Sequence, residues 1–114
     1  PEGTGWAIEV DGLAVGGIGL KPGEDVHAKT ANIGYWLGEP YWGRGIMTDA
    51  VRAVSGHALS RLGFARVEAM VYEWNPASMR VLEKCGFLRE GVMRKNVFKD
   101  GELIDSVMFA RVAG

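Results

Sequence analysis

The chain has 114 residues, of which 47% are hydrophobic and 24% charged, a composition typical of one globular domain and not of a disordered segment. Thirteen Lys and Arg residues balance fourteen Asp and Glu residues, which argues against a general attraction to nucleic acid or to an anionic membrane. The one cysteine, Cys85, excludes an internal disulfide and a cysteine-based metal cluster, and a reducing cytoplasm is the simplest setting for it. No apolar run approaches the ~20 residues of a membrane span.

The first third of the chain is predicted to be β-structure. Residues 5–10 (GWAIEV) and 13–21 (LAVGGIGLK) are apolar runs joined by an Asp-Gly pair, a strong signal for a two-residue hairpin turn. A polar loop marked by Pro-Gly follows. Residues 30–38 (TANIGYWLG) then predict a third strand, which Glu-Pro ends.

From Ile46 the apolar residues recur at helical spacing, and Gly63 supplies a stop. The predicted apolar face of this helix consists of Ile46, Met47, Ala50, Val51, Val54, Ala58 and Leu62. The opposite face, which should meet water, takes Asp49, Arg52, Ser55 and Arg61.

The remainder predicts a strand, a short helix and a final hairpin. Residues 65–73 (ARVEAMVYE) alternate with period two, Asn75 is a good N-cap followed by Pro76, and Gly86 ends the helix. Two strands near 87–98 and 103–112 are joined by the turn KDGE. The order is βββ-α-β-α-ββ, and the strand–helix–strand crossover in the middle implies a parallel pair. The class is therefore α/β, with antiparallel hairpins at both ends.

Two glycines, Gly43 and Gly45, stand directly before the long helix in EPYWGRGIMTDAV. Two interpretations are open. The turn between strand and helix is tight, or bare backbone N–H groups at the positive end of the helix receive an anion, with Arg44 adding charge. Neither a nucleotide P-loop nor a dinucleotide fingerprint matches these residues.

The run IGYWLGEPYWGRGIMTDAV, followed by NPASMRVLEKCGF and preceded by VGGIGL, resembles the GNAT superfamily of acetyl-CoA-dependent N-acetyltransferases. The likeness is closest to the branch of ribosomal-protein N-terminal (Rim-type) acetyltransferases and covers essentially the whole chain. It implies one domain over residues 1–114, a GNAT-like mixed and mostly antiparallel twisted sheet with a central parallel splayed strand pair and flanking helices. The usual first β-α-α segment would precede Pro1, so we expect an N-terminally incomplete domain.

The resemblance also implies where acetyl-CoA binds. The family's pyrophosphate loop and the helix start after it fall on Trp42, Gly43, Arg44, Gly45, Ile46, Met47 and Thr48. The splayed strand at Tyr35, Trp36 and Leu37 would pair its free backbone groups with the pantetheine arm. Asn75 matches the asparagine that contacts the cofactor from the far side.

For catalysis the resemblance points to Ser78 as the proton donor to the departing thiolate, because relatives with a tyrosine donor carry it where this chain has Leu82. The alternative is a helix-N-terminal serine that satisfies local backbone groups. Glu73 is the nearest acidic candidate for a general base, since Asn32 stands where relatives often have Glu; the alternative is a solvated carboxylate. A backbone N–H near Leu37 could polarise the thioester carbonyl.

The histidines, the cysteine and three aromatic residues are interpreted as structural or surface residues and not as catalytic ones. His27 and His57 are predicted to lie on the surface, and Cys85 to be a small core residue. Three aromatic residues, Trp36, Tyr41 and Trp42, are interpreted as core and cofactor-wall residues and not as a nucleic-acid stacking platform.

The function that follows is an N-acetyltransferase that moves acetyl from acetyl-CoA to a primary amine, either a peptide N-terminus or a small molecule, by direct attack in a ternary complex. The rival is a catalytically weak acyl-CoA-binding or regulatory module, favoured by Leu82, Asn32 and by Met47, where Gly or Ala is usual. A purely structural interaction domain would leave the glycine turn unexplained.

We predict no metal, nucleic acid or membrane partner. Without the β-α-α segment before Pro1, apolar surface of the sheet would be uncovered. We therefore expect either self-association, such as a homodimer, or a longer chain.

Overall fold

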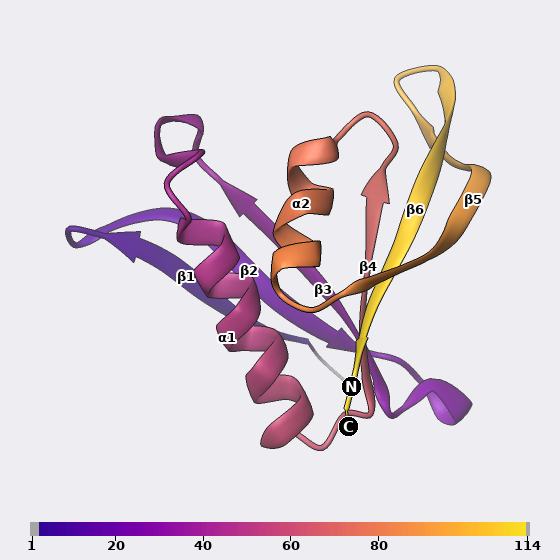
Figure 1. Ribbon diagram of the computed structural model, residues 1–114, viewed down its shortest axis with the longest axis horizontal. Helices are drawn as coiled ribbons and strands as arrows, with labels where there is room; N and C mark the ends of the chain where they lie inside the picture. Colours follow the sequence, from indigo (N-terminus) through magenta and orange to yellow (C-terminus); the bar gives the residue numbers. More distant parts are fainter. Residues whose placement is uncertain (1–2, 114) are drawn as a thin grey trace.

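The computed structural model describes residues 3–113 (Figure 1). The predicted order of strands and helices is confirmed, with short 3-10 helices in two loops, η1 (Asp25–His27) and η2 (Glu39–Tyr41). The main elements are β1 (Thr4–Val10), β2 (Leu13–Pro22), β3 (Thr30–Leu37), α1 (Ile46–Ser60), β4 (Arg66–Tyr72), α2 (Pro76–Lys84), β5 (Leu88–Lys99) and β6 (Glu102–Val112). Within this part of the chain, neither helix has the length and apolar character needed to cross a membrane.

The six strands form one sheet in the order β1-β2-β3-β4-β6-β5. Every neighbouring pair is antiparallel except β3 and β4, which run parallel because α1 carries the chain from one strand to the other. The predicted GNAT-like fold class, a mixed and mostly antiparallel sheet with one central parallel pair, is confirmed.

Local turn chemistry explains both antiparallel hairpins at the edges of the sheet. Asp11 and Gly12 have φ values of 52° and 80°, and Asp100 and Gly101 have 53° and 79°. Two successive residues with positive φ form the turn whose twist matches that of the flanking strands. Asp-Gly is a sequence that tolerates this conformation, so the hairpins follow directly from these two pairs.

Both helices cover the same face of the sheet (Figure 1). Strand β3 shows the consequence, because Ala31 and Ile33 point to the helices and are buried while Asn32 and Gly34 are exposed on the other face. The core lies between helices and sheet, and its largest fully buried apolar side chains are Phe87, Phe109, Leu82, Val51 and Val67.

The prediction for α1 was wrong at two positions. Ser55 was assigned to the solvent face, yet it is 0% exposed. Its Oγ donates to the carbonyl oxygen of Arg52 at 3.4 Å and accepts from Nη1 of Arg111 at 2.7 Å, so the buried hydroxyl is satisfied by partners that helical periodicity does not reveal. Leu62 was assigned to the apolar face, but α1 ends at Ser60 and Leu62 is 45% exposed in the turn that follows.

Candidate functional site

The parallel pair at the centre of the sheet is joined only at its start. The register pairs β3 with β4 over three positions, ending at Asn32 and Glu68. Beyond them β3 continues to Leu37 bonded only to β2, and β4 continues to Tyr72 bonded only to β6. In Figure 1 the two arrows diverge, and α2 lies over the gap. The facing edges therefore carry backbone N–H and C=O groups that have no ladder partner among the described residues, which calls for another partner.

The glycine turn leads into α1 with a conformation that needs glycine. Gly43 and Gly45 have φ values of 74° and 76°. A Cβ built on either one would meet no heavy atom within 4 Å, so the space in front of the turn is open. Gly45 is the N-cap of α1 and supplies no side-chain hydrogen bond. The N–H groups of the first helical turn therefore face this space without a side-chain cap, at the positive end of the helix dipole.

Three aromatic and basic side chains surround this turn. The indole Nε1 of Trp42 donates to the carbonyl oxygen of Leu37 at 2.7 Å, which fastens the turn to the end of β3. The guanidinium of Arg44 lies 5.4 Å from the centre of the Tyr41 ring. Trp36 and Trp42 are 64% and 62% exposed, so their interpretation as core residues was wrong. Both sit at or just after the open strand end, where burial would require further chain or a ligand.

The start of α2 is closed by its own side chain. Oδ1 of Asn75 accepts a hydrogen bond from the backbone N of Ser78 at 3.2 Å, and Pro76 occupies the first helical turn. The predicted N-cap is confirmed.

At the other end of α2, Sγ of Cys85 donates to the carbonyl oxygen of Thr48 at 3.2 Å and thereby links the two helices. Burial raises the pKa of the Cys85 thiol, and the prediction of a core residue is confirmed.

The hydroxyl of Ser78 is not used in the cap. It lies 2.6 Å from the phenol oxygen of Tyr35, so the two hydroxyls share a hydrogen bond from α2 to β3. Burial raises the pKa of Tyr35 above its usual 10.0, which keeps the phenol protonated at neutral pH. The sequence predicted a role for the backbone of Tyr35 and none for its side chain. The signal for its side chain was the alternation of Ile33, Tyr35 and Leu37, which places all three on the helix face.

The remaining predicted residues lie apart from this hydroxyl pair. Glu73 is exposed just after β4, where its backbone N donates to the carbonyl oxygen of Asp105 at 3.1 Å. Leu82 is fully buried and contributes packing alone, whereas Asn32 faces away from the helices. The predicted surface position of His57 is confirmed, and its ring packs edge-on against Trp6. His27 is also exposed, as predicted.

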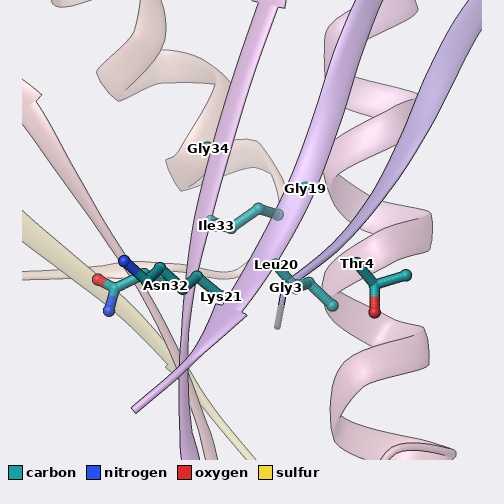
Figure 2. Close-up of a pocket in the computed structure, with 8 residues that line it drawn as sticks. All are labelled: Gly3, Thr4, Gly19, Leu20, Lys21, Asn32, Ile33 and Gly34. Atoms are coloured by element: carbon teal, nitrogen blue, oxygen red, sulfur yellow. The ribbon is translucent and has the colours of Figure 1, made fainter. Parts of the chain in front are cut away.

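Two hollows lie over β1, β2 and β3. Figure 2 shows the first, of about 370 Å³, lined by Gly3, Thr4, Gly19, Leu20, Lys21, Asn32, Ile33 and Gly34. The second, of about 460 Å³, extends to Tyr35 and Trp36 and so touches the splayed strand. The three strands place Gly5, Gly19 and Gly34 in register, so this part of the sheet surface consists of backbone without side chains. Within residues 3–113 no three His, Cys, Asp or Glu side chains gather closely enough to hold a metal ion.

Three hydrogen bonds join the predicted elements into one region. Trp42 connects the glycine turn to Leu37 on β3, Tyr35 connects β3 to Ser78 on α2, and Cys85 connects α2 to Thr48 on α1. An open helix start, an open strand edge and a protonated hydroxyl pair thus surround the gap between β3 and β4. Such a region can hold an extended ligand with an anionic group at one end.

Comparison with known proteins identifies the class of this region. The family described as "Acetyltransferase (GNAT) domain" matches residues 1–88, which contain the glycine turn, both parallel strands and α2. The chain belongs to this family.

The relatives it matches include Rim-type enzymes. The probable N-acetyltransferase YjcK of Bacillus subtilis is 49% identical over 72% of this chain and 45% of its own length. The ribosomal-protein-serine acetyltransferase of Escherichia coli is 33% identical over 74% of this chain and 49% of its own. The structure of Mycobacterium smegmatis RimJ in complex with CoA-disulfide superposes with a TM-score of 0.89, at 30% identity, over 97% of this chain and 53% of that one. The chain spans about half the length of these relatives.

Proposed function

We propose that the protein transfers acetyl from acetyl-CoA to a primary amine by direct attack of the amine in a ternary complex. The observation that carries the proposal is the uncapped start of α1, which opens through Gly43 and Gly45 beside the unpaired edge of β3. Membership of the GNAT family supports the same reading. One site thus offers a place for a diphosphate and, next to it, a strand edge for an extended arm.

The diphosphate end would be bound mainly by backbone. The N–H groups of Ile46, Met47 and Thr48 are free of intrahelical partners by helix geometry, and an anion would act as the missing cap. Arg44 is exposed on the turn and adds a positive charge. The open space in front of Gly43 and Gly45 lets an anion approach the main chain closely.

The pantetheine arm would lie along β3 in the gap. Amide groups of the arm can take the place of the missing strand, so the free backbone groups of residues 35–37 would be satisfied. A backbone N–H near Leu37 would then polarise the thioester carbonyl. On the α2 side, Oδ1 of Asn75 already accepts the capping bond, so Nδ2 is the atom left to donate to the cofactor.

Ser78 would donate a proton to the thiolate as the carbon–sulfur bond breaks, and Glu73 would accept a proton from the amine, directly or through water. No covalent intermediate on the protein is needed when the two reactants are held side by side. Two relatives with ribosomal-protein or Rim-type names favour a peptide N-terminus as acceptor. A small primary amine is the other class to be tested.

A catalytically weak acyl-CoA-binding or regulatory module remains the second candidate. The observation that favours it is Leu82, which is fully buried where many relatives place a tyrosine donor, together with Asn32, which faces away from the helices. The two candidates differ in turnover. Release of free thiol from acetyl-CoA should depend on added amine for the enzyme and should be absent for the module, while CoA binds in both.

The assay uses the full reading frame that encodes this chain, with peptides of different N-terminal residues and a set of small amines as acceptors. Ser78→Ala should lower kcat by ~10²–10⁴-fold, the usual loss for a general acid, and leave the Kd for acetyl-CoA nearly unchanged. Near-full turnover of this variant would remove Ser78 from the reaction. Thiol release that no amine stimulates would favour the binding module.

A further inference from the structure

The hydrogen bond between Tyr35 and Ser78 joins the two elements that flank the gap. Their oxygens are 2.6 Å apart, and the contact reaches from the C-terminal half of β3 to the first turn of α2. We infer that Tyr35 is a positioning residue that holds the Ser78 hydroxyl and supplies, through it, the proton that the leaving thiolate takes up. This inference rests on the proposed acetyl transfer.

Other contacts hold both Tyr35 and Ser78 in place. Tyr35 is paired in register with Ile18 of β2, and its ring packs against the buried core below the helices. The backbone of Ser78 is fixed by the cap from Asn75 at 3.2 Å. Since the local backbone does not use the serine hydroxyl, its only hydrogen-bond partner among the described residues is the phenol. Either hydroxyl can donate in this bond, and when the phenol donates, the serine oxygen accepts and the serine proton is left free for another acceptor.

Acid strength explains why a serine at this position needs the tyrosine. A serine that gives up its proton alone becomes an alkoxide, a much stronger base than the thiolate it has protonated. A phenol has an ordinary pKa of about 10 and a thiol about 8.5, so the two lie within roughly two pH units of each other. Burial raises the pKa of Tyr35, so proton transfer from its phenol to a thiolate is uphill, but far less so than transfer from serine alone.

The relay balances in atoms and charge. The amine nitrogen bonds to the acetyl carbon, the carbon–sulfur bond breaks, and the electron pair stays on sulfur. The sulfur takes the proton of Ser78 Oγ while Ser78 Oγ takes the proton of Tyr35 Oη, which leaves a neutral serine and a phenolate. The amine nitrogen gives its proton to Glu73, directly or through water, Glu73 releases it to solvent, and the phenolate regains a proton from solvent. No other reactant is required.

The surroundings keep the phenol protonated before the reaction. Burial is the main cause that raises the pKa of Tyr35, the bond from Ser78 opposes it, and the Cys85 thiol at the end of α2 adds to it. β2 places apolar Ile18 directly opposite in register. The charged side chains on the nearby helices, Asp49 and Arg52 on α1 and Arg80, Glu83 and Lys84 on α2, are exposed to solvent.

The first test removes one hydroxyl at a time. Tyr35→Phe should lower kcat by ~10²-fold or more with little change in the KM for acetyl-CoA, as expected when proton donation is lost. Ser78→Ala should show a comparable loss, and the double variant should be no slower than the slower single variant, because both remove the same relay. Tyr72→Phe is the matched control. Its ring packs against Trp74, and its hydroxyl has no hydrogen-bond partner among the described residues.

The second test changes the acidity of the phenol and not its shape. A site-specific 3-fluorotyrosine at position 35 is a stronger acid than tyrosine. Because the phenol must be protonated to act, kcat is full below its pKa and is lost as the pH rises through it. The alkaline limb of the kcat profile should therefore move to lower pH. The same replacement at position 72 should leave the alkaline limb unchanged. If Tyr35 had a purely structural role, 3-fluorotyrosine at position 35 would also leave the limb unchanged.

The outcomes separate the inference from the proposed function. If the unmodified protein transfers acetyl but Tyr35→Phe retains full kcat, the relay is wrong and the acetyltransferase proposal stands. An unmoved alkaline limb with fluorotyrosine at position 35 also overturns the relay. If no amine stimulates thiol release from the unmodified protein, both proposals fall. Circular dichroism and CoA affinity of each variant establish that it is folded.

Discussion

The two helices of this chain start in opposite ways. At α2, Asn75 caps the first turn through its side chain, and Pro76 fits the next position. At α1, the N-cap is Gly45 in a left-handed conformation with φ 76°, and no side chain caps the helix. Relative to a capping side chain, glycine at the N-cap costs only about a few tenths of a kcal/mol, so α1 loses little stability. A helix start without a cap keeps its N–H groups available to an external anion.

The two ends of the proposed site therefore have different roles. The start of α1 is arranged for binding, with open space before it and positive charge on Arg44. The start of α2 is arranged for rigidity, so that the Ser78 hydroxyl is presented in one orientation toward Tyr35. Variants at the two helix starts should therefore separate cofactor affinity from stability.

The largest expected effect on CoA affinity is at Gly45. Gly45→Val places a β-branched residue where φ is 76° and puts methyl groups into the space in front of α1. We expect micromolar-scale CoA binding, about −8 kcal/mol, in the unmodified protein and at least a tenfold loss, about 1.4 kcal/mol, in the variant. Titration calorimetry measures both.

Gly63→Val is the control for backbone strain. Gly63 has φ 78° and equally open surroundings, but it follows the other end of α1. Both variants should lose ~1–3 kcal/mol of unfolding free energy, because non-glycine residues are costly in this conformation. Only Gly45→Val should lose CoA affinity beyond what unfolding explains. Equal CoA affinities in the two variants would contradict the phosphate site.

A smaller effect is expected at Asn75. Asn75→Ala should destabilise the protein by ~1 kcal/mol, measured by thermal or denaturant unfolding, since the cap of α2 is lost. Asn75→Ser retains a capping oxygen and should recover most of that stability. Nδ2 is absent from both variants, so if Asn75 also contacts the cofactor, both should bind CoA more weakly. A serine variant with unchanged CoA affinity would leave Asn75 with its capping role alone.

The smallest effect is expected at Arg44. Arg44→Ala should weaken CoA binding by less than tenfold, and the loss should be larger at low salt than at high salt because the charge is exposed and screened. Arg61→Ala is the control, since Arg61 lies at the opposite end of the 15-residue helix, ~22 Å away and beyond the Debye length of ~10 Å. An effect of Arg44→Ala that does not vary with ionic strength would make it an ordinary surface charge.

The features that could be predicted from the sequence are those whose cause lies within a few residues. Asp-Gly pairs form the hairpin turns because both residues tolerate positive φ, and Asn75 with Pro76 starts α2 because a side-chain oxygen reaches the N–H three residues on. Gly45 opens α1 for the same local reason. The order of elements and the parallel crossover follow from these signals, and the family resemblance supplied the splay between β3 and β4.

Contacts between elements far apart in the sequence could not be predicted, because they depend on how the helices and strands pack together. Ser55 has the polarity of a surface residue, but Arg111 on β6 reaches its hydroxyl and makes its burial favourable. The aromatic side chains of Trp36 and Trp42 look like core residues in the sequence, yet both are exposed. Trp36 lies over Gly17 of β2 on the sheet face away from the helices, and Trp42 follows the end of β3. The bond between Tyr35 and Ser78 joins residues 43 positions apart, and no periodicity or local propensity specifies a contact that depends on where α2 lies on the sheet.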